Sequence, residues 1–378
     1  MFFTPGTHTI QRNRTHIYHT FIPNSLNGRI LIKSDEELTM LLSKAHRFLG
    51  VLEGTARWIK NIDAIETAFM AKEAFLSCKI EDSKATLEEM LYSTKKKNKH
   101  LQETQCYLET INKTMKIKDE AYSNLSLCSL YRMMMADEKN ESDTCYRKIQ
   151  IFDLPGVFIT DMEMYNPTAP EYIETAMNDL ERYVIKENSG PDVLVKIALF
   201  IYQFVTISPF EIENRIFSRL VFMFLLTNYK VLSRHILCYS DFIILDKTGF
   251  YDRLAAVRFA GDYNEWIKHF LKGIIFSAEK AINTINNLVA LKDENLKRIN
   301  DAGYSDINIF KLLEYMEQNP MTNIKTATQS IGLSYNTTAK MVNILLDIGI
   351  IRQGNQLSRN RCYVYQKYID TVFGYEKK

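Results

Sequence analysis

Glycine and proline are scarce in this chain of 378 residues, with 14 glycines and 8 prolines. Both residues interrupt helices, so their scarcity is compatible with long helical segments. Apolar residues recur mostly at the spacing i, i+3, i+4, which is the pattern of helices that bury one face. The chain is 46% apolar, which is enough for a large core in two or three folding units. We therefore expect a mainly α protein.

Other absences exclude whole classes of protein. The formal net charge is only +2, so the overall charge favours neither an acidic nor a basic partner. No apolar run approaches the roughly 18 residues that a membrane span requires. The first residues also lack the basic start and apolar stretch of a signal peptide. We expect a cytoplasmic protein that does not bind membranes.

The cysteines lack the spacing of a disulfide framework or of a zinc site. They form no C-x-x-C pair and are not grouped with histidines into the four-ligand spacing of a zinc site. The six are Cys78, Cys106, Cys128, Cys145, Cys238 and Cys362. This scatter fits a reducing compartment, in which we expect the thiols to stay free.

Two capping boxes mark helix starts in the first hundred residues. Ser34 stands three residues before Glu37, and Thr86 three before Glu89, the spacing at which both side chains satisfy free backbone amides. Residues 1–34 carry prolines and an Asn-Gly turn, so we expect them to be irregular. Helices are predicted over residues 38–52, 64–76 and, in two segments, 100–137.

One β-hairpin is predicted in the middle of the chain. The segment from Cys145 to Phe152 alternates polar and apolar residues as a short strand does, with Gly156 to Ile159 as the second arm. Beyond it, helices are expected over residues 171–185, 193–205, 214–226, 250–260 and 263–290. The charged stretch from Lys292 to Asp301 is predicted to be a linker to the last unit.

The last unit has the most regular pattern. Its predicted elements are a helix at 309–318, a second at 324–331, a third from Ser334 to about Ile348, and strands at 350–353 and 361–366. Helix, helix-turn-helix and hairpin is the order of elements in a winged helix. The unit is therefore predicted to be a winged-helix domain.

Two functions remain open for this unit. From Asp306 onward, Lys and Arg outnumber Asp and Glu by only nine to six, a weak basic bias. Binding to DNA would place the third helix in a major groove and the hairpin beside it, through Tyr335, Asn336, Thr337, Lys340, Arg359 and Arg361. The alternative is a module for contact with another protein or with a second copy of the chain.

A polar loop from Ser208 to Glu213 lies between two strongly apolar helical segments. Loops that carry polar groups between buried helices usually position something. The sequence here, Ser208-Pro-Phe-Glu-Ile-Glu-Asn-Arg-Ile-Phe-Ser-Arg219, resembles the core motif of Fic (Fic/Doc) proteins, H-P-F-x-D/E-G/A-N-G/K-R-x-G-R. The positions that match are Pro209, Phe210, Asn214 and Arg219.

Other segments resemble the same family in the same order, over about residues 20–370. Residues 73–89 are similar to the Fic N-terminal region with its S/T-x-x-x-E-G/N inhibitory helix, in which Ser77 and Glu81 match. Residues 146–152 resemble the hairpin flap that holds target peptides. The resemblance implies an N-terminal helical region at 1–120, a Fic core at 121–291 and a winged helix at 302–378.

The resemblance also implies transfer of AMP from ATP, with Mg²⁺, onto a hydroxyl of a protein, but the reactive positions differ. Ser208 stands where the family has its general-base histidine, and a serine hydroxyl is a poor proton acceptor at neutral pH. The Mg²⁺ ligand is Ile212, which has no oxygen to offer. Glu213 stands where the family has a small residue that lets phosphate approach closely, and Ile216 stands where it has the first phosphate-binding arginine. We expect ordinary AMP transfer to be lost.

The remaining polar residues allow more than one role. Asn214 is predicted either to cap the following helix or to contact a phosphate, and Arg215 and Arg219 either to bind nucleotide or to pair with an acidic side chain. Because the inhibitory glutamate's expected partner is Ile216, Glu81 is predicted to pair with Arg215 or Arg219 for structural reasons. Ser77 belongs to the same inhibitory-type helix.

Three functions follow for the whole chain. The first is a catalytically degenerate Fic protein that binds nucleotide or acts as a scaffold or regulator. The others are a DNA-binding regulator with a vestigial Fic core, and an active, autoinhibited AMP transferase with a rearranged site. The target protein cannot be read from the sequence.

Overall fold

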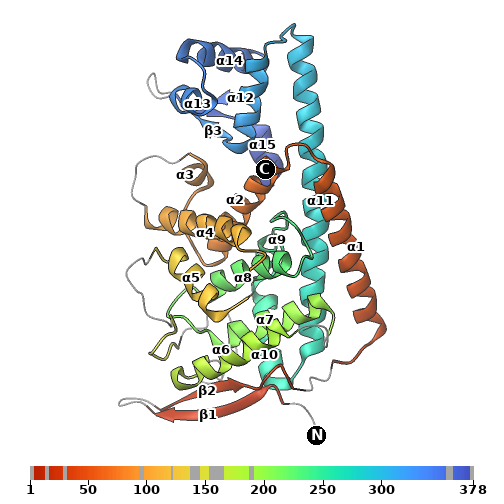
Figure 1. Cartoon of the computed structure of the whole chain (residues 1–378), viewed down its shortest axis with the longest axis vertical. Helices are drawn as coiled ribbons and strands as arrows, with labels where there is room; N and C mark the ends of the chain where they lie inside the picture. The colour runs from red at the N-terminus through yellow and green to blue at the C-terminus, as the bar shows by residue number, and fades with distance from the viewer. Residues whose placement is uncertain are drawn as a thin grey trace.

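The computed structural model describes residues 4–12, 17–28, 32–92, 98–120, 122–136, 145–152, 166–186, 191–354 and 361–374. It is mainly helical, as predicted (Figure 1). The helices before the last unit are α1 (Glu36–Trp58), α2 (Ile62–Ile80), α3 (Leu87–Leu91), α4 (Lys99–Lys116), α5 (Asn124–Met134), α6 (Pro170–Ile185), α7 (Val193–Ile207), α8 (Asn214–Asn228), α9 (Ser240–Ile243), α10 (Lys247–Ala260) and α11 (Tyr263–Asp301). Among the described helices, none combines the length and apolar character needed to cross a membrane.

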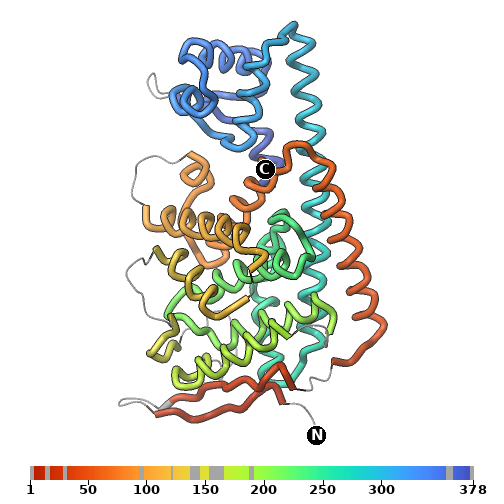
Figure 2. The backbone as a smooth tube through the Cα atoms, viewed as in Figure 1, coloured from red at the N-terminus to blue at the C-terminus, as the bar shows by residue number. Residues whose placement is uncertain are grey.

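Helices α7 and α8 occupy the centre of the molecule. Nearly all of their residues are buried, as expected of helices that are apolar all round. Helices α6 and α11 pack on α7, helices α4 and α2 pack on α8, and α1 and α11 run side by side along one flank (Figure 2). The loop between α7 and α8, residues 208–213, is therefore held between two rigid elements.

The predicted linker from Lys292 to Asp301 is wrong, because α11 continues through it to Asp301. Leu291, Asn295 and Ile299 recur at helical spacing and are buried. The high charge of this stretch belongs to the exposed face, where Glu294 and Arg298 form an i, i+4 ion pair of 2.9 Å, a common stabilising pair on helices.

The expectation that residues 1–34 are irregular is also wrong. Strands β1 (Gly6–Arg12) and β2 (Ile17–Pro23) form an antiparallel hairpin, which lies at one end of the molecule (Figure 1). Phe21 of β2 is buried, and its ring packs against His8 of β1 with centroids 5.0 Å apart. Cross-strand pairs of this kind stabilise short sheets, and β2 also packs on α6 and α7.

The strand predicted from Cys145 to Phe152 is not present, since this segment has no regular secondary structure. Its backbone bonds to the core instead: the Arg147 N–H donates to the Pro209 carbonyl at 2.9 Å. The predicted second arm, Gly156 to Ile159, lies outside the described residues.

The prediction of free cysteines is wrong for one pair. Cys128 of α5 and Cys145 form a disulfide, with their Cα atoms 5.5 Å apart. The two residues are 17 positions apart in sequence, so nothing in their spacing marks them as partners. Cys78, Cys106, Cys238 and Cys362 are free.

One of the two predicted capping boxes is present. The Thr86 side chain accepts from the Glu89 N–H while the Glu89 carboxylate accepts from Thr86. At the start of α1, however, the N-cap is Asp35 and not Ser34, with the carboxylate accepting from the Leu38 N–H at 2.8 Å. An aspartate is as good a cap as a serine, and it also complements the helix dipole.

The last unit has the predicted order of helix, helix-turn-helix and hairpin. Its elements are α12 (Ile307–Gln318), β3 (Met321–Thr322), α13 (Ile324–Ile331), α14 (Tyr335–Asp347), β4 (Arg352–Gln353), β5 (Tyr363–Val364) and α15 (Gln366–Phe373), with sheet order β3-β5-β4. Two elements of this unit were not predicted, β3 and α15. Helix α15 begins at Gln366, which had been predicted to end the strand at 361–366. Helix α15 packs on α2 and α11 and so joins this unit to the core.

Candidate functional site

The loop from Ser208 to Glu213 begins and ends with a residue in the left-handed region. Ser208 has φ 44° and ψ 69°, and Glu213 has φ 59° and ψ 20°. Residues other than glycine rarely adopt this conformation. At Glu213 the backbone therefore has the shape that glycine favours, although the side chain is a glutamate.

Ser208, at the position of the family's base, is buried and fully engaged. Its Oγ donates to the Val205 carbonyl at 2.7 Å, and its own carbonyl accepts from Arg147 Nε at 2.8 Å. The side chain is only 2% exposed. A hydroxyl in this state completes the end of α7, and it is too weak a base to take up a proton at neutral pH.

Asn214 closes the loop by bonding to the backbone of Phe210. Its Oδ1 accepts from the Phe210 N–H at 2.9 Å, and its Nδ2 donates to the Phe210 carbonyl at 2.8 Å. The predicted helix cap is wrong, because Asn214 bonds to the backbone of the loop, and the phosphate contact stays a prediction. The N-cap position of α8 is Glu213, which makes no side-chain cap bond.

Aromatic contacts hold the middle of the loop. The Phe210 ring stacks on Tyr131 of α5 with centroids 3.9 Å apart and meets Phe217 of α8 edge-on at 5.1 Å. The Tyr131 hydroxyl donates to the Ile212 carbonyl at 3.2 Å. The Ile212 side chain is 54% exposed, so the position of the Mg²⁺ ligand carries an exposed apolar group.

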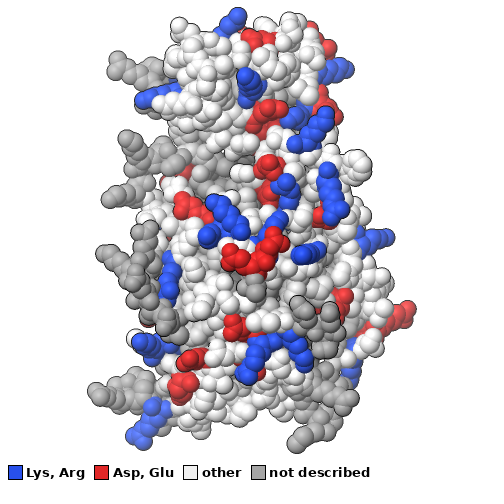
Figure 3. Space-filling view, viewed as in Figure 1, with Lys and Arg blue, Asp and Glu red and all other residues white. Residues whose placement is uncertain are grey.

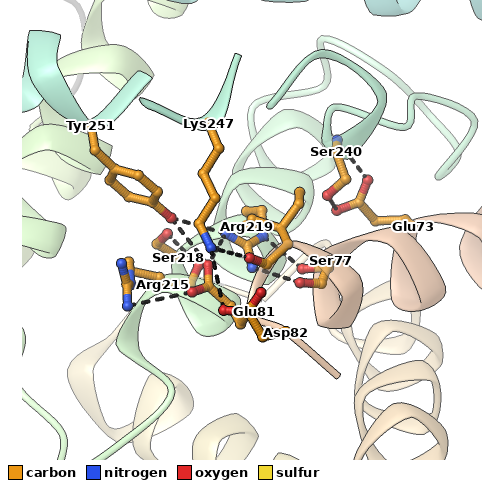
Figure 4. Close-up of polar contacts among 11 residues, drawn as sticks. Glu73, Ser77, Glu81, Asp82, Arg215, Ser218, Arg219, Ser240, Lys247 and Tyr251 are labelled. Carbon is orange, nitrogen blue, oxygen red and sulfur yellow. Dashed lines mark hydrogen bonds and ion pairs between the residues drawn. The ribbon is translucent and has the colours of Figure 1, made fainter. Parts of the chain in front are cut away.

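Arg219 meets the predicted inhibitory helix (Figure 4). Its Nε donates to Ser77 Oγ at 2.6 Å, its Nη2 to the Ser77 carbonyl at 2.9 Å, and its Nη1 to Glu81 Oε1 at 3.1 Å. Arg215 Nη2 lies 3.4 Å from Glu81 Oε2. The pairing predicted for Glu81 is present with both arginines.

The charges of this cluster compensate one another. Burial alone would raise the pKa of Glu81, but Arg219 and Arg215 outweigh it and hold that pKa below its ordinary value. Burial opposes the charge of Arg219 as well, yet Glu81 beside it raises the Arg219 pKa. The cluster is a nearly buried ion network, with Glu81 13% and Arg219 4% exposed.

Sequence reasoning missed two residues that complete the cluster, Tyr251 and Lys247, and a separate contact of Glu73 on the same helix α2. The Tyr251 hydroxyl donates to Glu81 Oε1 at 3.1 Å. Lys247 Nζ donates to the Ile80 carbonyl at the end of α2, and Glu73 accepts from the Ser240 hydroxyl at 2.6 Å. Tyr251 lies on α10, within a helix that was predicted over residues 250–260, but its role was not predicted. Nothing in the sequence marks Lys247.

A cavity of about 550 Å³ lies beside the loop. Its lining includes the carboxylates of Glu81, Glu103 and Glu213 along with Lys99 and His100. The rest is mostly apolar, from Cys78, Cys106, Tyr107, Met134, Met135, Ala136, Ile212 and Ile216. Burial, then Glu103 and Glu81, raise the pKa of Glu213. This crowding of negative charge disfavours a phosphate chain at the loop.

The residues predicted to bind DNA lie apart from this cluster, in the last unit. Tyr335 begins α14 and is 56% exposed. Asn336, Lys340 and Arg361 are exposed as well, whereas Thr337 is half-buried and its N–H donates to Ser334 Oγ at 3.1 Å. Arg359 lies outside the described residues. Acidic and basic side chains are interspersed over the face seen in Figure 3, with no large patch of one sign.

Two histidines that could be mistaken for a base are core residues. His235 is 3% and His269 7% exposed. Burial lowers the pKa of His235 to about 3 and that of His269 to about 4. Both are neutral at pH 7.

Comparison with known proteins agrees with this architecture. Residues 39–116 match the family model described as Fic/DOC family N-terminal, and residues 123–226 match that of the Fic/DOC family. A Fic family protein from Desulfovibrio desulfuricans G20 has a similar fold, with a TM-score of 0.58 and 16% identity, over 89% of this chain and 98% of that one. A Fic domain containing signaling protein from Bacteroides thetaiotaomicron VPI-5482 has a TM-score of 0.50 and 17% identity, over 67% and 97%. The chain belongs to the Fic/DOC family.

Proposed function

We propose that this protein has lost ordinary AMP transfer and that its Fic core acts as a scaffold or regulatory module. The observation that carries the proposal is the state of Ser208. A base at this position must take a proton from the incoming hydroxyl, but a serine hydroxyl is a far weaker base than an imidazole, and that of Ser208 is buried and bonded to Val205 O at 2.7 Å.

Mg²⁺-ATP, which proteins of this family generally use, does not fit the residues at this loop. Magnesium requires oxygen ligands, and the family's ligand position is Ile212. Phosphates need cations and free backbone amides, but the Phe210 amide is bonded to Asn214. Arg219 is bonded to Ser77 and Glu81. Burial, and after it the carboxylates of Glu103 and Glu81, raise the pKa of Glu213, and an acidic side chain beside the loop opposes a bound phosphate.

The test is incubation of the full chain with labelled ATP and Mg²⁺, alone and in a cell lysate. We expect no labelled band. We also expect no rise in melting temperature with Mg²⁺-ATP, whereas a ligand at 100 times its Kd would add about 2.7 kcal/mol of stability. Labelling by the unmodified chain would contradict the proposal.

Restoring the motif is the positive control. Ser208→His with Ile212→Asp supplies the base and the ligand but leaves the phosphate cradle obstructed, so we expect no labelling. Adding Glu213→Gly, Arg215→Gly and Ile216→Arg should restore some Mg²⁺-dependent labelling, because the backbone at Glu213 already has the conformation of a glycine. Equal labelling by the unmodified and the restored chains would show that the lost positions are not needed.

A second candidate function is binding of DNA by the last unit, a winged helix in this proposal. It is favoured by the exposure of the first turn of α14, where Tyr335 and Asn336 face solvent. Lys340 is the cation of this helix. We expect weak binding of duplex DNA at low salt in a fluorescence anisotropy titration, reduced in Lys340→Ala. Lys311→Ala, an exposed lysine on α12, serves as the control.

A further inference from the structure

The loop from Ser208 to Glu213 is held by contacts on two sides, from α5 and from the segment Cys145 to Phe152. On the α5 side, Tyr131 stacks on Phe210 at 3.9 Å and donates to the Ile212 carbonyl. Cys128 lies one helical turn before Tyr131 and is 3% exposed. Cys128 and Tyr131, the residue that contacts the loop, therefore lie on the same rigid helix.

On the other side, Arg147 holds the start of the loop. Its Nε donates to the Ser208 carbonyl at 2.8 Å and its Nη2 to the Ile207 carbonyl at 3.3 Å. Its guanidinium also donates to Thr168 and Ile149, and its backbone N–H to Pro209. Every acceptor that these bonds use is a backbone carbonyl.

Within the described residues, the side-chain bonds of Arg147 all go to carbonyls, and this side chain is buried. Arg147 is 2% exposed, and burial lowers its pKa to about 10. Burying a charged side chain is costly, and a covalent attachment of the segment that carries Arg147 would help to hold that side chain in place. The disulfide between Cys128 and Cys145, two residues before Arg147, provides it.

We propose that the Cys128–Cys145 pair is a redox-sensitive clasp: a covalent link that, when formed, holds α5 and the segment from Cys145 to Phe152 against the loop from Ser208 to Glu213. With the bridge formed, the two sides of the grip are covalently joined. With the bridge reduced, Arg147 keeps its place only through noncovalent contacts, and the loop opens more often. The clasp does not depend on whether the core transfers a nucleotide.

The reductant is a dithiol. One of its thiolates attacks Sγ of Cys145, which is the partly exposed member of the pair, and Cys128 leaves as a thiolate that takes a proton. The second thiol of the reductant then displaces Cys145 from the mixed disulfide. Two electrons and two protons pass to the protein, and the reductant becomes a cyclic disulfide.

The experiment compares amide hydrogen exchange of the full chain before and after reduction by dithiothreitol. We expect peptides that cover residues 145–152 and 204–214 to exchange at least about tenfold faster in the reduced protein, with α11 peptides unchanged. A non-reducing digest should contain a peptide pair linked through Cys128 and Cys145.

Two variants separate the clasp from general effects. Cys128→Ser with Cys145→Ser should exchange quickly at the loop with or without dithiothreitol. Cys106→Ser, which removes a partly exposed free thiol, should keep the full response. The proposal is overturned if the linked peptide is absent, if loop exchange is the same in both redox states, or if reduction accelerates exchange equally in α11.

Discussion

At the scale of single residues, Glu213 combines a left-handed backbone with a crowded carboxylate. Its φ is 59°, which costs a residue other than glycine about 1 kcal/mol. Glu213→Gly should therefore raise the free energy of unfolding by about 1 kcal/mol in urea titrations. Glu211→Gly is the matched control: this exposed neighbour has no positive φ, so the glycine should destabilise by about 0.5–1 kcal/mol. A loss of stability in Glu213→Gly would contradict the reasoning.

The charge of Glu213 can be separated from its backbone by a pH series. Its pKa is raised in the folded protein, so the folded state binds its proton more tightly than the unfolded state does. Ionised Glu213 then lowers stability at neutral pH, and this loss disappears as the pH falls below the ordinary glutamate pKa. Glu213→Gln should be more stable than the parent at pH 7 and equal to it near pH 4. A gain that persists at pH 4 would assign the effect to packing.

Glu81 is the residue at which the degenerate and the autoinhibited interpretations differ most. If the site is merely inhibited, Glu81→Gly frees Arg219 and labelling by ATP appears. We expect no labelling and a loss of about 3 kcal/mol, because removing one partner of a buried pair leaves Arg219 uncompensated. Asp82→Asn is the control, since Asp82 is exposed, and it should change stability little.

The stabilisation from Glu81 should also depend on pH. Its pKa is lowered in the folded protein, so its contribution is complete above the ordinary glutamate pKa. It is lost as the pH falls through the lower folded value. The difference in unfolding free energy between the parent chain and Glu81→Gly should accordingly shrink under acid conditions. A constant difference from pH 7 to pH 3 would contradict an electrostatic origin.

At the scale of elements, two helical glycines that look alike in sequence differ in what surrounds them. A Cβ on Gly273 of α11 would lie 2.5 Å from Tyr239 Oη and 2.6 Å from a ring carbon of Phe242, whereas one on Gly54 of α1 would meet nothing within 4 Å. Gly273→Ala should destabilise by about 1–3 kcal/mol through overpacking against α9. Gly54→Ala should stabilise by about 0.5–1 kcal/mol through helix propensity. Thermal unfolding of both variants checks the pair, and equal shifts would contradict the assigned contacts.

At the scale of the whole molecule, Glu317 joins the last unit to the core. This buried residue of α12 accepts from Asn61 Nδ2 at 2.7 Å, before α2, and pairs with Lys292 Nζ of α11 at 3.0 Å. Glu317→Ala should lower the free energy of unfolding by about 1–3 kcal/mol, because two polar partners lose their acceptor. Glu314→Ala, on the exposed side of the same helix, should be neutral. If the two variants are equally stable, this contact does not hold the units together.

Helix α2 connects the units at the same scale. Its end carries Ser77 and Glu81, which bind Arg219, and its Phe75 ring meets Phe373 of α15 edge-on at 6.3 Å. The segment that resembles an inhibitory helix is thus in contact with both helix α8, which follows the loop from Ser208 to Glu213, and the last unit.

The sequence by itself determined the helical class, most helix positions and the Thr86–Glu89 cap, because periodicity and capping depend on neighbours within one or two turns. It also located the loop and the pairing of Glu81, through the spacing of matched motif residues. The end of α11 was not predicted correctly, because the many charged residues of its exposed face outnumber the few apolar residues of its narrow buried face.

Only the tertiary structure decided which distant groups meet. The β1–β2 hairpin, the Cys128–Cys145 bridge and the grip of Arg147 on the Ser208 carbonyl all join residues whose spacing carries no signal. The cap role of Asn214 was undecided for the same reason: its amide fits a helix cap or a loop backbone, and the folded position of Phe210 selects the backbone. A buried polar group bonds to whatever the fold brings within reach, because leaving it unpaired is costly.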